Sequence, residues 1–248
     1  MLVSEGIRGE YAPTGVLRVA LNYGNRVLVG RNEAGEPFGI SVDMARALAN
    51  HLDLQLHFVE FERAVDVSSS AQNDVWDVCF LAIDPTRAAT IDFSDPYVRI
   101  EGYYLASRVS NAADARQLVE SGASVGTVEG SAYTLTLLRK PGAENLVLYR
   151  NLSAALEALD AGDVEAIAGI RQSIEAEAAL RLGSRVLQPP FMEIRQAMAV
   201  PRGRPQASAH LRTFLADIAR GGVVGDVLER HGVSRDCAIA PEGSPRAR

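Results

Sequence analysis

Short apolar segments alternate with amphipathic helical segments along almost the whole of this 248-residue chain. Residues 78–83, Val-Cys-Phe-Leu-Ala-Ile, are apolar throughout, as expected for a strand covered on both faces. Residues 41–52 carry apolar side chains at helical spacing, and Ser41 is the expected N-cap of that helix. Because strands that alternate with helices form parallel sheets, this order predicts an α/β fold.

The expected elements fall into two successive sets. The expected strands are residues 16–21, 54–61, 78–83, 103–107, 124–128, 146–149, 164–169 and 198–200. The expected helices are residues 41–52, 68–73, 112–120, 132–138, 153–159, 171–182, 205–220 and 223–230. Two sets predict two lobes, each a mostly parallel sheet flanked by helices: residues 1–101 with 198–248, and residues 102–197. Since ligands of such sheets bind at the carboxyl ends of strands, we expect a ligand cleft between the lobes.

The composition of the chain makes several kinds of binding partner and cofactor unlikely. The net charge is −6, so we expect no binding to nucleic acid, and no apolar run is long enough for insertion into a membrane. The first ten residues lack a basic segment followed by an apolar one, so we expect no secretory signal. The four histidines show no metal-ligand spacing, and Cys79 and Cys237 are expected to be free thiols. We therefore predict no metal and no cofactor, and a disordered tail at residues 241–248.

The segment Asp84-Pro-Thr-Arg87 follows the apolar strand directly. An arginine at the end of a buried strand presents a planar fork of donors that suits a small carboxylate. The alternative is a solvated surface arginine paired with Asp84 or Asp92.

The ordered set of motifs resembles the bacterial extracellular solute-binding proteins of family 3, which have the type II periplasmic binding protein fold. The resemblance covers residues 15–232, nearly the whole chain. The motifs that carry it are Gly15-Val-Leu-Arg-Val, Gly39-Ile-Ser-Val-Asp-Met-Ala, Asp84-Pro-Thr-Arg87, Asp92-Phe-Ser-Asp-Pro-Tyr97, Val125-Gly-Thr-Val-Glu-Gly-Ser131 and Ala161-Gly-Asp-Val-Glu-Ala166.

The resemblance implies a binding site at the strand ends. Arg87 falls on the position of the family's carboxylate-binding arginine. Gly130 and Ser131 fall on the loop whose backbone N–H and hydroxyl groups hold the same carboxylate at a helix N-terminus. Asn22 and Asn25 fall where the end of the first strand contacts the ligand; the alternative is that they only shape a turn, where Asn is favoured.

Several positions depart from the family pattern. The Ser or Thr residues that usually precede the arginine are Phe80 and Ala82, so only the backbone of Ala82 is available to a ligand. The Thr that usually follows the Gly-Ser turn is Ala132. The next residue, Tyr133, is either a ligand contact or a residue of the helix core.

The departure with the largest consequence is Ile170, where the family has the Asp that pairs with an α-ammonium group. A desolvated ammonium without a partner is costly. We therefore expect a carboxylate or similar anion with no standard α-amino contact, held at its two ends by Arg87 and Arg171. Gln172 and the two asparagines would contact its polar substituents. A register slip of one residue would instead leave Arg171 outside the cleft.

The expected function is the non-catalytic capture of a small polar or anionic solute by a monomer. In the family such proteins deliver solute to an ABC permease, and the resemblance implies a periplasmic location, with a cytoplasmic one left open by the missing signal. One alternative is a cleft enzyme of the cyclohexadienyl dehydratase type, with Asp84, Glu101 and Glu129 as candidate acids. The other is a cytoplasmic ligand sensor.

Overall fold

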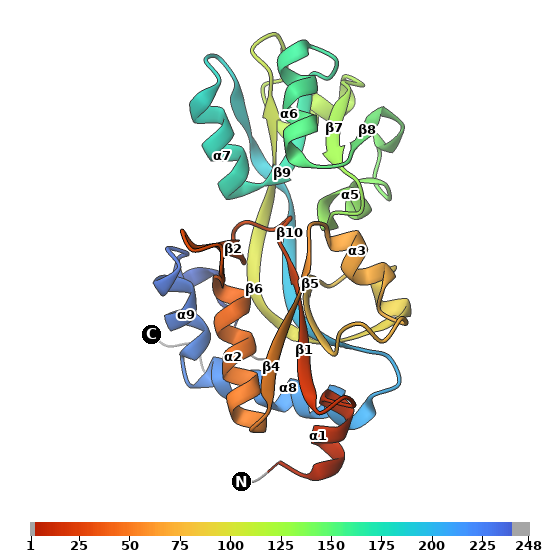
Figure 1. Ribbon diagram of the computed structural model, residues 1–248. Coiled ribbons are helices and arrows are strands. Elements are labelled where there is room, and N and C mark those ends of the chain that lie inside the picture. Colours follow the sequence, from red (N-terminus) through yellow and green to blue (C-terminus); the bar gives the residue numbers. More distant parts are fainter. Residues whose placement is uncertain (1–2, 240–248) are drawn as a thin grey trace. The chain divides into compact units, whose positions relative to one another are not determined.

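The computed structural model describes residues 3–239, which divide into two units (Figure 1). Unit 1 runs to Arg99 and resumes at Arg195, and unit 2 is Ile100–Ile194. The chain passes from one unit to the other within two long strands, β6 (Ile91–Ala106) and β10 (Arg185–Pro201). The divisions expected from the sequence, after residues 101 and 197, lie two and three residues further along the chain.

Unit 1 is built on a sheet with three parallel strands. β1 (Val16–Asn22) lies between β4 (Gln55–Phe61) and β5 (Val78–Ala82) and is parallel to both. Residues 196–199 of β10 form an antiparallel strand beside β5. The carboxyl ends of β1, β4 and β5 therefore meet at the same edge of the sheet.

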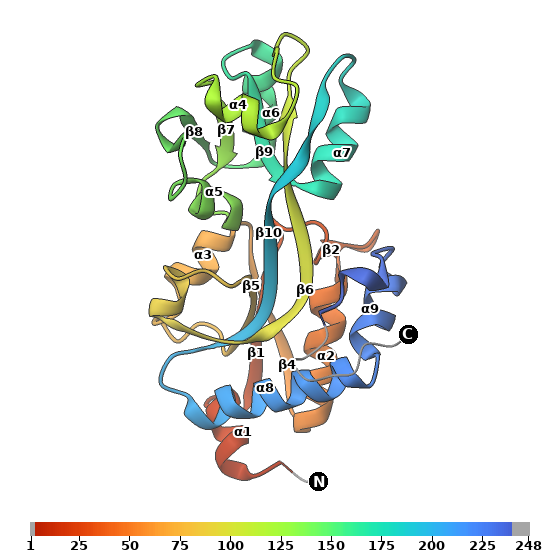
Figure 2. The ribbon, with the colours of Figure 1, turned by 180° about the vertical axis from the view of Figure 1, so that it is seen from behind.

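Helices cover both faces of this sheet because successive side chains of each strand point to opposite faces. Ala20 of β1 packs in a cluster with Val67 and Trp76, whereas Leu21 packs with Val42 on the other face. In Figure 1, α2 (orange) and α9 (blue) lie side by side, and Figure 2 shows α8 packed along α1. The helices of unit 1 are α1 (Glu5–Tyr11), α2 (Ile40–Leu52), α3 (Ala64–Ser69), α8 (Pro205–Arg220) and α9 (Val223–Arg230), with 3-10 turns at Arg87–Ala89 and Arg235–Cys237 and a small hairpin of β2 (Gly30–Arg31) and β3 (Pro37–Phe38).

The start of α2 corrects one prediction. The N-cap is Gly39, with φ at 123°, and a Cβ there would lie 2.7 Å from the carbonyl oxygen of Leu28. Ser41 is a buried residue inside the helix, and its backbone N–H donates to the same carbonyl at 2.9 Å. The prediction of Ser41 as N-cap was wrong because this backbone conformation is open only to glycine, which outweighs the side-chain preference.

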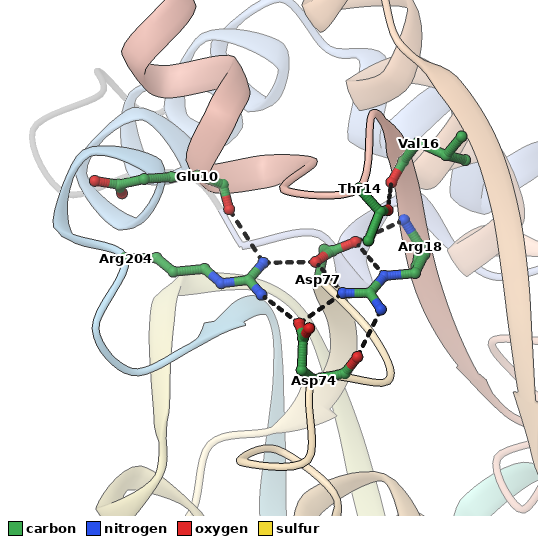
Figure 3. A network of polar contacts seen from close by, with 7 residues as sticks. All are labelled: Glu10, Thr14, Val16, Arg18, Asp74, Asp77 and Arg204. Carbon is green, nitrogen blue, oxygen red and sulfur yellow. Dashed lines mark hydrogen bonds and ion pairs between the residues drawn. The ribbon is translucent and has the colours of Figure 1, made fainter.

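An ionic network joins α1, α8 and the sheet of unit 1 (Figure 3). Asp77, which is fully buried, accepts hydrogen bonds from the Nε of Arg18 at 2.9 Å and from the Nη1 of Arg204 at 2.7 Å. Arg204 also donates to the backbone carbonyl of Glu10 at 3.1 Å, and Arg18 donates to the exposed carboxylate of Asp74 at 2.8 Å. The network thus fixes the N-terminal helix to the rest of unit 1.

Unit 2 repeats the same design on a smaller scale. β7 (Val125–Val128) lies between β8 (Leu146–Tyr149) and β9 (Ala166–Ile170) and is parallel to both, and residues 102–106 of β6 pair antiparallel with β9. The helices of unit 2 are α4 (Ala115–Glu120), α5 (Ala132–Leu137), α6 (Leu152–Ala161) and α7 (Arg171–Leu180), with a 3-10 turn at Ala143–Asn145.

The strands of unit 2 also alternate between two cores. Tyr104 and Ala168 belong to the cluster that includes Leu118 of α4, whereas Tyr103 and Ile167 belong to the cluster that includes residues of α6 and α7. The prediction of an α/β fold with mostly parallel sheets is confirmed in both units.

Other differences from the sequence prediction concern single elements. Helix α1 was not expected, α3 begins earlier than predicted, and β6 and β10 are much longer than the short strands predicted at residues 103–107 and 198–200. The prediction for residues 241–248 lies outside the described residues. Among the helices that the structure describes, none is long and apolar enough to cross a bilayer.

Candidate functional site

Arg87 is a buried arginine that stands just beyond the carboxyl end of β5. Its residue is 4 % exposed, and its Nη1 donates to the carbonyl of Ala82 at 3.0 Å. Burial lowers the pKa of the guanidinium from its ordinary value, and the negative charge of Asp84 opposes that change. The alternative of a solvated surface arginine is therefore wrong. The carbonyl of Ala82, the group predicted to be available to a ligand, orients Arg87 instead.

The Asp-Pro-Thr sequence before Arg87 explains how the arginine is positioned. Asp84 is buried, and its Oδ1 accepts a hydrogen bond from the backbone N–H of Thr86 at 2.8 Å. The carbonyl of Asp84 accepts from the N–H of Ala88 at 2.9 Å. An aspartate that bonds the backbone two residues on closes a tight turn, and this turn directs Arg87 back toward the end of β5.

Asn22 and Asn25 lie at the end of β1, at the same edge of the unit 1 sheet as Ala82. The Oδ1 of Asn22 accepts from the N–H of Gly24 at 3.1 Å, so this side chain does shape a turn. The Oδ1 of Asn25 is buried and accepts no hydrogen bond within the described residues. A buried acceptor of this kind requires a donor, which makes Asn25 the better candidate for a ligand contact.

In unit 2, Gly130 and Ser131 form the turn between β7 and α5. Ser131 is the N-cap of α5, and its Oγ accepts from the N–H of Thr134 at 3.2 Å. Because the hydroxyl of Thr134 donates to the carbonyl of Val128 at 2.6 Å, its contact with Ser131 at 2.8 Å must be donated by Ser131. The hydroxyl proton of Ser131 is therefore engaged inside the turn, and its backbone N–H also donates within the turn, to the carbonyl of Val128 at 3.1 Å.

Tyr133 packs against the unit 2 core. It is partly buried beside the cluster that contains Leu137. Burial raises the pKa of its phenol to about 12. Its packing favours the core role that was left open as an alternative.

Arg171 and Gln172 begin α7 and are exposed, whereas Ile170 ends β9 and is buried. The guanidinium of Arg171 forms ion pairs with Glu101 at 3.1 Å and with Glu175 at 2.8 Å. The neighbour of Glu101 on β6, Gly102, is paired with Ile170 across the sheet, which brings Glu101 to the start of α7. The partner role of Glu101 was not predicted, because 70 residues separate it from Arg171.

Each unit thus gathers its own share of the predicted site at one sheet edge. β1 and β5 are parallel, so the asparagines and Arg87 follow neighbouring carboxyl ends in unit 1. β7 and β9 are parallel, so the Gly130 loop and Arg171 do the same in unit 2. Cys79 and Cys237 are free thiols, as predicted. In the described part of the chain, no group of three or more His, Cys, Asp or Glu side chains is placed to hold a metal ion.

Comparison with known proteins gives a family match over most of the chain. Residues 17–233 match the model of the bacterial extracellular solute-binding proteins, family 3. A curated relative, the amino-acid-binding protein AabA of Dichelobacter nodosus, is 21 % identical over 157 residues. That alignment covers 62 % of this chain and 62 % of the relative, so the match spans less than two thirds of its length.

Solved structures share the fold at low sequence identity. A mutant of ArgBP from T. maritima has a TM-score of 0.76 at 19 % identity, covering 92 % of this chain and 99 % of that one. A histidine kinase sensor domain with similarity to periplasmic binding proteins has a TM-score of 0.76 at 20 % identity, covering 91 % and 98 %. An ancestral amino acid-binding protein, a precursor of cyclohexadienyl dehydratase, has a TM-score of 0.74 at 18 % identity, covering 92 % and 99 %. These likenesses show the fold of two-lobed periplasmic binding proteins.

Proposed function

Because the chain belongs to the bacterial extracellular solute-binding proteins of family 3, we propose that it reversibly captures a small carboxylate-bearing solute at the carboxyl ends of its strands. The observation that carries the proposal is the buried guanidinium of Arg87, held by the carbonyl of Ala82 at a strand end. A rigid, desolvated fork of N–H donors binds a carboxylate bidentately and more strongly than a solvated one.

The other proposed contacts come from polar groups at the carboxyl ends of the strands. Asn25 contributes a buried acceptor to the solute, and the turn at Gly130 and Ser131 is the proposed contact of unit 2 with it. The side chains of Asn22 and Tyr133 are already engaged in the turn and in the core, so we assign them no direct contact with the solute. Part of the binding free energy is used in ordering the side chains and loops that contact the solute.

The solute class follows from the start of α7. Ile170 offers no charge to an ammonium group, and Arg171 is the cation at this position, with Gln172 beside it. We therefore favour dicarboxylates and hydroxy acids as solutes. Their second anionic or polar end would replace the carboxylate of Glu101 or Glu175 as a partner of Arg171. Standard α-amino acids would instead need Glu101 as the partner of their ammonium group.

The proposed biological role is that of the solute-binding component of an ABC-type uptake system outside the cytoplasm, acting as a monomer on a permease. The amino-acid-binding name of the curated relative supports a small solute as the ligand. The sensor alternative is supported by the likeness to a histidine kinase sensor domain.

A solute panel tests the proposal directly. Purified protein would be titrated calorimetrically with dicarboxylates, hydroxy acids and amino acids, and each acid would be compared with its primary amide. We expect saturable binding of at least one acid and a loss of binding for its amide, since the amide removes the charge that Arg87 recognises. Equal binding of an acid and its amide would contradict the role of Arg87.

The variant Arg171→Ala tests which class of solute the protein binds. Under the proposal this change weakens the best dicarboxylate or hydroxy acid about tenfold, the effect of losing one charge-assisted contact. Tight binding of an ordinary α-amino acid that is unaffected by Arg171→Ala and abolished by Glu101→Gln would overturn the class while leaving the binding function in place.

An enzyme of the dehydratase type is the second candidate, because a precursor of such an enzyme shares the fold. Of its candidate acids, Glu101 is paired with Arg171, Glu129 is exposed, and Asp84 closes the turn before Arg87. Incubation with prephenate or arogenate would show an aromatic product if this candidate were correct.

A further inference from the structure

Two histidines that lie far apart in the sequence meet on the surface of unit 1. His51 is in the last turn of α2 and His210 is in α8, and their Nε2 atoms are 3.3 Å apart. The ring of His51 also packs against Phe214, with 5.1 Å between centroids. These residues take no part in the proposed solute site. We propose that His51 and His210 form a binding site for a divalent transition-metal ion, with zinc as the best-suited ion.

The hydrogen bonds of Tyr11 fix the tautomer that such a site needs. The fully buried hydroxyl of Tyr11 donates its single proton to the carbonyl of Ala207 at 2.9 Å. Its contact with Nδ1 of His210 at 3.2 Å must therefore be donated by the imidazole. A neutral His210 then carries a lone pair on Nε2, the atom that faces His51. An N–H donated to a neighbouring oxygen is the usual way in which a metal-binding histidine is oriented.

The distances between the two rings match those of a shared ion. Zn–N bonds of about 2.0 Å in a tetrahedral site place two ligand nitrogens about 3.3 Å apart. Two imidazole rings bound to one tetrahedral zinc ion in this way have centroids about 5.2 Å apart. The observed separation of the His51 and His210 centroids is 5.2 Å.

The remaining coordination positions belong to water. Within residues 3–239 no third His, Cys, Asp or Glu joins this pair, and His51 is exposed to solvent. The ion would bridge the C-terminal end of α2 to α8. A site with two protein ligands binds zinc reversibly, and imidazole nitrogens suit zinc, copper and nickel but not calcium or magnesium.

Isothermal titration of tag-free, EDTA-treated protein with ZnCl₂ tests the proposal. We expect one zinc per chain, a loss of at least about tenfold in affinity for His51→Ala and for His210→Ala, and no change for His57→Ala, an exposed histidine on β4 of the same unit. His51→Ala is the decisive variant because the exposed position does not threaten the fold. Tyr11→Phe keeps both ligands and should weaken binding about tenfold through loss of the orienting contact.

A second readout identifies the coordinating groups. CoCl₂ should give the visible absorption of tetrahedral cobalt with the wild-type protein and with His57→Ala, but not with His51→Ala. Absence of stoichiometric zinc binding by the wild type, or equal binding by His51→Ala, would overturn the proposal. Solute binding by His51→Ala should be unchanged, so failure of this site and failure of the solute site give different results.

Discussion

Asp77 is the buried charge on which the ionic network of unit 1 converges. Two arginines and the backbone N–H of Arg18 donate to its carboxylate, and no part of it is exposed. Asp77→Asn should lower the free energy of unfolding by about 3 kcal/mol, because an amide cannot pair two guanidinium groups that remain partly buried. The matched control is Asp74→Asn, whose carboxylate is 69 % exposed and should leave stability nearly unchanged. Urea unfolding would distinguish the two, and equal effects would contradict this account.

Because of His210, we expect the free energy of unfolding to depend on pH. Burial, followed by His51, lowers its pKa, and Tyr11 and Phe214 are the other groups packed around the histidine pair. The unfolded chain takes up this proton near pH 6.5, whereas the folded chain takes it up only at lower pH. Stability from this group is therefore complete above pH 6.5 and is lost as the pH falls through the folded pKa.

The measurement for His210 is the urea midpoint at pH 7.5 and 5.5 in the presence of EDTA. His210→Gln should lose less stability between these two conditions than the wild type, and His57→Gln should behave as the wild type does. An unchanged pH dependence in His210→Gln would show that another group titrates.

At the scale of elements, Gly39 determines where α2 begins. An alanine there would bring Cβ to 2.7 Å from a backbone oxygen at a φ of 123°. Gly39→Ala should therefore destabilise the protein by about 2 kcal/mol or more. Gly9→Ala is the control: it lies in α1 with no atom near its would-be Cβ, so it should stabilise by about 0.5–1 kcal/mol. Thermal unfolding would show the opposite signs, and a neutral Gly39→Ala would contradict the strained cap.

The sequence predicts elements well where local signals suffice. The bounds of α8 and α9 were predicted correctly because Pro205 starts the first helix and Gly221-Gly222 separates the two. The long strands β6 and β10 were not predicted as single strands, because Pro96 and Gly102 interrupt the pattern of β6. Helix α1 was missed since Gly6 and Gly9 weaken its propensity, although Ser4 caps it and Tyr11 packs against α8.

Some features of the candidate site could also be predicted from local sequence, and others could not. The burial of Arg87 follows from local signals, an apolar strand and an Asp-Pro turn next to it. The contacts that change the interpretation are between residues distant in sequence: Glu101 with Arg171, and His51 with His210. A single sequence does not show such pairs, because they depend on strand register and helix packing.

At the scale of the whole molecule, family membership and the two units make solute capture the proposed function. The central claim is that the guanidinium of Arg87 binds the carboxylate of that solute. Arg87→Lys keeps the positive charge and removes the planar fork. Arg202→Lys is the matched control in unit 1, since Arg202 is half-exposed and paired with Asp92 at 3.5 Å.

The most direct test is calorimetric titration of the wild type, Arg87→Lys and Arg202→Lys with the tightest-binding acid of the solute panel. The account predicts that Arg87→Lys binds that acid about 10- to 100-fold more weakly, as expected for the loss of a bidentate charged contact, while Arg202→Lys binds as the wild type does. Wild-type affinity in a correctly folded Arg87→Lys protein would contradict it.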